Sequence, residues 1–442
     1  MKTHAGMLVA TATVVLVGCP FSQKYTVGGT LTGLAGQGLV LENNSGNDLQ
    51  LASNGAFTFT SGIKTGSAYA VTVKTQPSRP GQTCVVQNGS GTIGKTNISN
   101  VIISCTRAGR FAYVANQLSN NVSAYSIDSA TGFLSPVTGS PFAVSGTAPV
   151  SLAVAGNGRF LYLVNNGSNT VAVYSIDGTT GALTAMGLPK LTGNGPYAMA
   201  VDPTDRYLYV ANRASNSVSA YVIDPSAGLS TEISNSPFAV GTEPSSLKVG
   251  PNGNFLYVTN FHDADVTVLA INSASGSLSG ISGSPFGAGA GPLSIAINPA
   301  GTFAYVANET AATIAEYSIN ASSGGLTLVS GSPLVTSSRP ESLAVDAAGH
   351  FVYAANVTAN NEVAVYSIAP SSGALTASGS PTAAGTFPVN VVLDPSGKFA
   401  YVVNDISNNI SVYAVDSTTG ALTPASHSPF AAGNEPRSIA IN

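Results

Sequence analysis

The sequence predicts an all-β protein in which residues 107–442 form a seven-bladed β-propeller, preceded by a small β-sandwich domain over residues 24–106. Three observations support this fold. A short motif repeats every 47–49 residues from residue 113 onwards, and a period of this size indicates a solenoid or a propeller. Only 8% of the residues are charged and 48 are glycines, a composition typical of short strands joined by tight turns. The final segment also matches the first strand of the repeat, which predicts a closed ring.

The N-terminus has the features of an export signal. An apolar run over residues 7–17 follows Met1-Lys2, as in a signal peptide over residues 1–18. The run ends at Leu16-Val17-Gly18-Cys19, which resembles the lipobox of bacterial lipoproteins. That resemblance implies lipidation of Cys19, a short tether over residues 19–23, and a location in the cell envelope, at the outer membrane or on the periplasmic or extracellular side. The alternative is an ordinary secretory signal in which Cys19 is incidental.

Charge excludes one class of partner. The net charge is −4 and no basic run occurs, whereas a nucleic-acid-binding surface needs clustered Lys and Arg. We expect no nucleic acid and contact with a membrane only through the lipid anchor.

Residues 24–106 contain short strand-like runs separated by Gly, Asn and Ser clusters, which predict a small antiparallel β-sandwich. The remaining two cysteines, Cys84 and Cys105, lie in this segment. An even count in an exported protein favours a disulfide. No catalytic residues are evident here, so a spacer or docking role is the simplest interpretation.

The propeller repeat is carried by a Tyr followed three residues later by an Asn, and by a Pro at the same period. Each period holds four strand patterns, as a propeller blade requires. The final stretch, 438–442, matches the innermost strand of the other blades and supplies the strand that the first blade lacks. The seven Asn are Asn116, Asn165, Asn212, Asn260, Asn308, Asn356 and Asn404, and the prolines are Pro149, Pro196, Pro244, Pro292, Pro340, Pro388 and Pro436.

These Tyr-Val-x-Asn repeats resemble the YVTN-repeat propellers and the seven-bladed lactonase family that includes 6-phosphogluconolactonase-like proteins. The resemblance covers residues 107–442 and implies the propeller fold and, for an enzyme, hydrolysis of a lactone. Members of the family often carry Pro-Arg-His at the start of an inner strand, where this chain has Pro436-Arg437-Ser438. This difference argues against phosphogluconolactonase activity and leaves another lactone as the alternative substrate.

Repeated residues build blades, so function is expected where the copies differ. Positions after each Asn and around each Pro fall on one face of the ring and collect charge of both signs, which suits a small polar or anionic ligand. Solvated loop tips without a ligand are the alternative. The predicted ligand-binding residues are Tyr197, Glu243, Asp263, Asp265, Glu309, Glu341, Asp405, Glu435 and Arg437.

His262 is the one histidine expected on this face. A lactonase needs a base to activate water and a cation or donor for the developing oxyanion, so His262 is predicted as the base, with Arg213 or Arg339 as its partner. No metal site is predicted: the carboxylates could bind Ca²⁺, but no calcium-loop spacing occurs, and no cofactor is expected.

Recognition is the first functional hypothesis: the face binds a small molecule, a glycan or an envelope protein. A lactone hydrolase using the same face is the second. A structural component of the envelope is the third.

Overall fold

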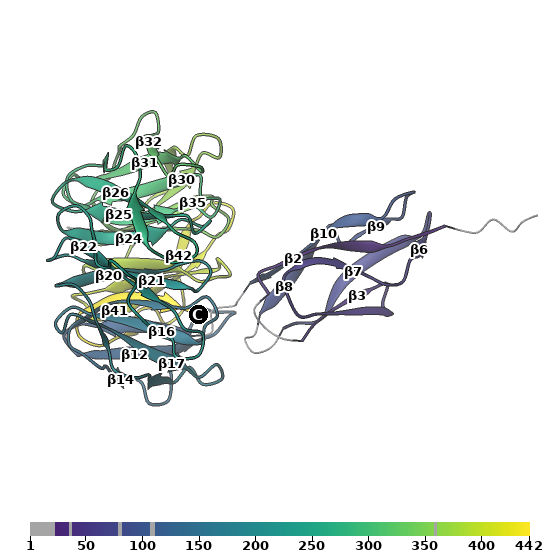
Figure 1. The fold of residues 1–442 in the computed structure, drawn as a ribbon, viewed down its shortest axis with the longest axis horizontal. Helices are drawn as coiled ribbons and strands as arrows, with labels where there is room; N and C mark the ends of the chain where they lie inside the picture. Colours follow the sequence, from purple (N-terminus) through teal and green to yellow (C-terminus); the bar gives the residue numbers. More distant parts are fainter. Residues whose placement is uncertain (1–22, 35–37, 78–81, 107–110, 358–359) are drawn as a thin grey trace, which may run out of the picture. The chain divides into compact units, whose positions relative to one another are not determined.

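This computed structural model describes residues 23–34, 38–77, 82–106, 111–357 and 360–442 (Figure 1). The predicted signal peptide and Cys19 lie outside the described residues. The chain divides into two compact units. One comprises the described residues up to 77 together with Cys84–Cys105, and the other comprises mainly Thr106–Asn442. Among the described residues, no helix is long and apolar enough to span a membrane.

The first unit is built from two four-stranded sheets and a short strand pair. One sheet has the strand order β5-β2-β10-β8, the other has the order β4-β3-β7-β9, and β1 pairs with β6. The strands are β1 (Lys24–Tyr25), β2 (Val27–Thr32), β3 (Leu39–Asn43), β4 (Asn47–Leu51), β5 (Gly55–Thr58), β6 (Ile63–Lys64), β7 (Ala68–Thr75), β8 (Thr83–Gln87), β9 (Ser90–Thr92) and β10 (Ile98–Thr106).

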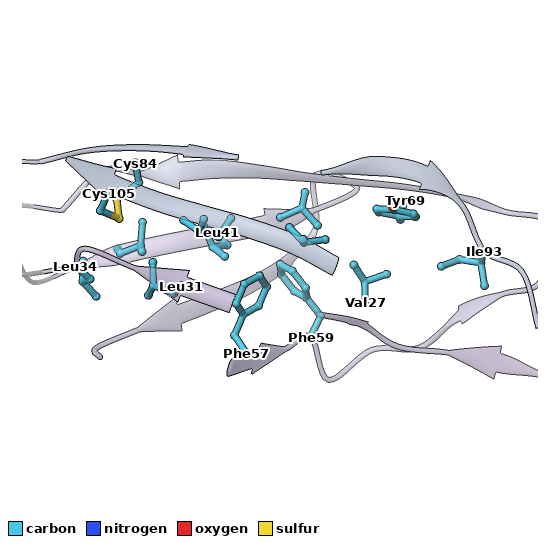
Figure 2. Close-up of a cluster of buried hydrophobic side chains, with 14 residues drawn as sticks. Val27, Leu31, Leu34, Leu41, Phe57, Phe59, Tyr69, Cys84, Ile93 and Cys105 are labelled. Atoms are coloured by element: carbon cyan, nitrogen blue, oxygen red, sulfur yellow. A yellow bond between two sulfur atoms is a disulfide. The ribbon is translucent and has the colours of Figure 1, made fainter. Parts of the chain in front are cut away.

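Alternating residues of both sheets form one apolar core in this unit. Val27 and Leu41 come from different sheets and are fully buried, and Phe57 meets Phe59 edge to face (Figure 2). The expected disulfide is present and joins Cys84 to Cys105 on neighbouring strands. The prediction of a purely antiparallel sandwich is wrong for one pair, because β2 and β10 run parallel. Parallel neighbours need a long crossover between them, and here the chain crosses to the other sheet before it returns.

The second unit consists of seven sheets, one for each blade, which confirms the predicted fold. The inner strands begin at or next to the repeated prolines. They are β15 (Pro149–Val154), β20 (Pro196–Val201), β24 (Pro244–Val249), β29 (Pro292–Ile297), β34 (Arg339–Val345), β39 (Pro388–Leu393) and β44 (Pro436–Ile441).

The second strands carry the repeated Tyr and Asn and are almost entirely buried. They are β11 (Phe111–Asn116), β16 (Phe160–Asn165), β21 (Tyr207–Asn212), β25 (Phe255–Asn260), β30 (Phe303–Asn308), β35 (Phe351–Val357) and β40 (Phe399–Asn404). The third strands are β12 (Asn121–Ile127), β17 (Thr170–Ile176), β22 (Ser217–Val222), β26 (Asp265–Ile271), β31 (Thr313–Ile319), β36 (Glu362–Ile368) and β41 (Asn409–Val415).

Each third strand pairs with short outer strands. Six blades have a three-residue fourth strand: β13 (Leu134–Pro136), β18 (Leu183–Ala185), β27 (Leu278–Gly280), β32 (Leu326–Leu328), β37 (Leu375–Ala377) and β42 (Leu422–Pro424). In the third blade a single bridge, Tyr221 to Glu232, takes its place. Two-residue strands complete the edges: β14 (Phe142–Ala143), β19 (Lys190–Leu191), β23 (Phe238–Ala239), β28 (Phe286–Gly287), β33 (Leu334–Val335), β38 (Thr382–Ala383) and β43 (Phe430–Ala431).

The ring closes as the sequence predicts. β44 pairs antiparallel with β11, so the first blade contains strands from both ends of the propeller segment. In Figure 1 the yellow C-terminal strands accordingly lie beside the blue strands that begin the propeller. The Asn442 side chain extends this junction by accepting a hydrogen bond from the backbone N–H of Phe111 (3.0 Å).

Repeated tyrosines join neighbouring blades. The Tyr113 hydroxyl donates to the carbonyl of Gly181 in the next blade (3.0 Å), and Tyr209 does the same to Gly276 (2.9 Å). These glycines have positive φ, which glycine adopts readily. An added Cβ at Gly181 would also strike the ring of Phe111 at 2.4 Å. The repeat therefore encodes contacts between blades as well as strands.

Candidate functional site at the channel mouth

Each repeated Asn is fully buried, and Asn116 shows how such a side chain can hold the loop between two blades. The amide nitrogen of Asn116 donates to Asn121 (2.7 Å) and to Ser123 (2.9 Å) on the third strand. Its amide oxygen accepts the N–H of Gly433, in the loop that leads to the inner strand (3.1 Å). These contacts support the structural role expected of the repeated Asn.

The residue after each Asn lies against the residue before the inner-strand proline. The N–H of Gln117 donates to the carbonyl of Glu435 (2.8 Å), and the N–H of Asp405 donates to that of Phe387 (2.9 Å). The variable positions of the repeat are thus brought to one end of the inner strands.

A cavity of about 690 Å³, which we call the channel, lies between the inner strands of all seven blades. This volume falls in the range of small-molecule sites. We define the channel mouth as the ring of lining residues that follow the inner-strand prolines. The ring consists of Val150, Tyr197, Ser245, Leu293, Glu341, Val389 and Arg437.

Glu341 and Arg437 are the two charged residues of the channel mouth. The Glu341 carboxylate makes no hydrogen bond to any residue in the described ranges. Burial raises its pKa, which the guanidinium groups of Arg339 and Arg437 partly oppose and the carboxylate of Asp405 reinforces. A half-buried carboxylate with a raised pKa is a stronger base than an ordinary glutamate, as a general base requires.

Arg437 is held on two sides. Its guanidinium pairs with Asp405 (3.1 Å) and donates through Nε to the side-chain oxygen of Gln117 (2.6 Å). Asp405 is buried, and its second oxygen, Oδ1, has no hydrogen-bond partner among the described residues. Burial raises the pKa of Asp405, and Arg437 opposes that rise.

The other two arginines of this face form ion pairs between neighbouring blades. Arg213 pairs with Glu243 (2.9 Å), and its guanidinium lies over the rings of Tyr197 and Phe261, at 5.2 and 5.0 Å from their centres. Arg339 is exposed and pairs with the buried Glu309. All three arginines therefore help to join blades, and all three act electrostatically on Glu341.

The three predicted catalytic residues do not line the cavity. His262 is exposed in the turn between β25 and β26, where its N–H donates to the carbonyl of Thr242 (3.3 Å). The structure brings Arg213 and Arg339 within electrostatic reach of Glu341, but it does not bring His262 to the cavity.

The predicted ligand-binding residues have several placements. Tyr197, Glu341 and Arg437 line the cavity, whereas Glu243, Glu309 and Asp405 are the partners of the three arginines.

The remaining three stabilise turns. The carboxylate of Asp263 accepts the N–H of Thr242 (2.6 Å), which lowers its pKa. Asp265 accepts from the Asn260 amide (2.7 Å), and burial raises its pKa. Glu435 has positive φ, and its N–H donates to Asn408 (2.8 Å).

Lys248 also lines the cavity and is not among the residues predicted from the sequence. The repeats contain a signal that would have revealed it. At the fourth residue after the inner-strand proline, the other six blades carry Ala153, Ala200, Ala296, Ala344, Val392 and Ala440. In the described residues, no group of three or more His, Cys, Asp or Glu side chains is arranged to hold a metal ion.

Comparison with known proteins identifies the propeller. Residues 103–244 and 247–440 match the family model described as lactonase, 7-bladed beta-propeller. No curated protein matches the chain.

Solved structures share the fold at low sequence identity. A candidate 6-phosphogluconolactonase from Bacteroides fragilis has a TM-score of 0.68 and 19% identity over 76% of this chain and 98% of its own. A second candidate, from Bacteroides uniformis, has a TM-score of 0.68 and 20% identity over 76% and 100%. The periplasmic gluconolactonase PpgL of Pseudomonas aeruginosa has a TM-score of 0.65 and 20% identity over 75% and 98%.

Proposed function

Because this chain belongs to the lactonase family of seven-bladed β-propellers, we propose that its channel mouth binds a small polar lactone and hydrolyses it. The observation that carries the proposal is Glu341, a half-buried carboxylate without a hydrogen-bond partner in the described chain, on the wall of a small-molecule-sized cavity. The structurally similar gluconolactonase from P. aeruginosa supports an aldonolactone as the first substrate to test.

The proposed reaction uses two residues of the channel mouth. Glu341 takes a proton from water as the water oxygen attacks the lactone carbonyl carbon. Arg437 stabilises the negative charge that develops on the carbonyl oxygen. The ring C–O bond then breaks, the leaving alkoxide takes the proton back from Glu341, and the product is a hydroxy acid.

This proposal moves the base from His262 to Glu341. His262 is exposed and outside the cavity lining, so a substrate in the cavity would lie beyond its reach. A base must come within hydrogen-bond distance of the proton that it takes, directly or through one water.

The test is hydrolysis of a panel of aldonolactones and simple γ- and δ-lactones. We expect Glu341→Gln to lower kcat by about 10²–10⁴-fold, the usual contribution of a general base. His262→Ala should retain activity, as should Glu232→Gln, the same change at an exposed site away from the cavity. Thermal melting of each variant shows whether the fold is retained.

The pH profile gives a second readout. The base works when deprotonated, so activity rises with pH through the pKa of Glu341. Because burial raises that pKa, the acid limb of kcat/KM should lie above the ordinary glutamate value of about 4.5. Activity that is lost in His262→Ala and kept in Glu341→Gln would return the base to His262 and overturn the proposal.

Recognition without turnover is the second candidate function. It is favoured by the ion pairs of Arg213, Arg339 and Arg437, since arginines already paired with carboxylates are weaker stabilisers of a new negative charge. A protein that binds members of the panel but hydrolyses none would support recognition of a small ligand. Capture of a glycan or an envelope protein would instead support recognition of that larger partner.

We also propose export and lipidation at Cys19, based on the N-terminal sequence.

A further inference from the structure

The cavity contains a second charged position, well separated from the channel mouth. Lys248 lies three residues beyond the mouth residue Ser245 on the same inner strand, β24. At about 3.3 Å per residue in a strand, the two Cα positions are roughly 10 Å apart along the channel. Lys248 is therefore deeper in the channel than Glu341 and Arg437.

The surroundings of Lys248 are apolar. The equivalent residues of the other six blades are alanines and one valine, and all six line the same cavity. At the level between Lys248 and the mouth, two polar side chains are already engaged: Ser342 accepts the N–H of Val391 (3.2 Å), and Asn390 accepts that of Ile439 (3.0 Å). These side chains join adjacent inner strands.

Lys248 has neither an ion pair nor a hydrogen bond within the described ranges, although its side chain is exposed to the channel. The channel walls partly desolvate the ammonium group, and this lowers its pKa. Among the described residues, no carboxylate opposes that shift. Between the low-dielectric walls of a channel, an ammonium group attracts an anion more strongly than it does on an open surface.

We propose that Lys248 forms an anion site inside the channel that binds the carboxylate group of a small organic acid. A lysine ammonium is a compact point charge that serves a single anionic group, and the apolar ring suits the carbon skeleton attached to it. The cavity volume restricts the ligand to a small molecule. This site is independent of the proposed hydrolysis at Glu341 and exists whether or not the protein is an enzyme.

The test observes Lys248 directly by ¹³C NMR. Reductive methylation with ¹³C-formaldehyde labels lysines while keeping their charge, and the resonance of Lys248 is assigned by its loss in Lys248→Met. The labelled protein is titrated with sodium acetate and with sodium gluconate, and separately with sodium chloride at the same ionic strength. Exposed Lys398, in the turn before β40, serves as the internal reference.

We expect a saturable shift of the Lys248 resonance at about millimolar carboxylate. The pKa of Lys248 should rise when the carboxylate binds, because the anion stabilises the charged form. Lys398 should respond only to ionic strength. The result should persist in Glu341→Gln, which separates this site from the proposed active site.

Two results would overturn the proposal. One is a Lys248 resonance that does not saturate with either carboxylate. The other is an equal shift in sodium chloride, which would mean screening or a site without preference for carboxylates. Neither readout depends on turnover, so failure of the hydrolysis experiment leaves this test intact.

Discussion

Glu316 occupies a position of the third strand, β31, that the other blades fill with alanine or valine. It is 3% exposed, and its Oε1 accepts the N–H of Leu375 in the next blade (2.8 Å). Burial raises the pKa of Glu316, and the hydrogen bond from Leu375 only partly opposes the rise. A negative charge on Glu316 therefore lowers the stability of the folded protein, because it lies in an otherwise apolar interface between blades.

The stability of the folded protein depends on pH because the pKa of Glu316 is raised. The folded protein holds the Glu316 proton more tightly than the unfolded chain does, so the contribution to stability is greatest below the ordinary value of about 4.5. It falls as pH rises through the raised pKa. Glu316→Gln keeps the hydrogen-bond acceptor and removes the charge. We expect a Tm higher by about 2 °C at pH 8, the size expected for a change of roughly 1 kcal/mol in a large domain.

Melting curves at pH 4 and pH 8 check this prediction. The gain should be smaller at pH 4, where the wild-type side chain is more protonated. Glu232→Gln, at an exposed site on the third blade, should leave Tm unchanged at both pH values. A variant that melts lower than wild type at pH 8 would contradict the interpretation of Glu316 as a destabilising charge.

At the scale of the element, β44 is the strand that closes the ring. It pairs along β11 from Ala112 to Ala115, and Ile439 is buried in the core that joins the first and last blades. Without β44 the first blade has no inner strand, and the edge of β11 is left unpaired. The cooperative ring then becomes an open chain of blades.

Deletion of residues 438–442 should therefore abolish the single cooperative unfolding transition of the propeller. Calorimetry or circular dichroism with heating measures this. A synthetic peptide that contains residues 436–442, added at high concentration, should restore the transition. That result would show that loss of this strand causes the loss of cooperativity. An unchanged melting curve for the deleted chain would rule out this model of closure.

The sequence predicted the elements better than it predicted the site, for a physical reason. The blades repeat, so the buried Tyr and Asn of each second strand occur at a fixed period, and ring closure follows from the match of the last strand. The charged residues of the channel face occur once each. Sequence cannot tell which of them become ion pairs, as Arg213 does, and which stay unpaired, as Glu341 does. The parallel pairing of β2 and β10 could not be predicted either, because the alternating pattern of a strand is the same in both directions.

At the scale of the whole molecule, the lactonase propellers compared with this chain share its fold at about 20% identity. Packing between blades depends on a few repeated side chains and tolerates change elsewhere. The channel positions are free to vary, and ligand choice can change without a change of fold. In this chain the charged residues that line the channel are Glu341, Arg437 and Lys248.

Export is the remaining prediction at this scale. In cells that carry the lipoprotein pathway, the expressed chain should incorporate labelled palmitate and fractionate with membranes. Cys19→Ser should lose both properties, whereas a chain with the disulfide residue Cys84 changed to Ser should still incorporate the label. Mass spectrometry of the N-terminal peptide gives the modified residue directly. A wild-type chain that is exported without lipid would support the ordinary secretory signal.

The pairing of β11 with β44 has a consequence for biosynthesis. About 320 residues separate the two strands, and ribosomes add roughly 5–20 residues per second. Some 15–65 seconds therefore pass between the emergence of β11 and that of its partner. During that time the inner edge of β11 lacks its partner strand and is open to pairing with another extended segment. The first blade to be synthesised is the last to be completed.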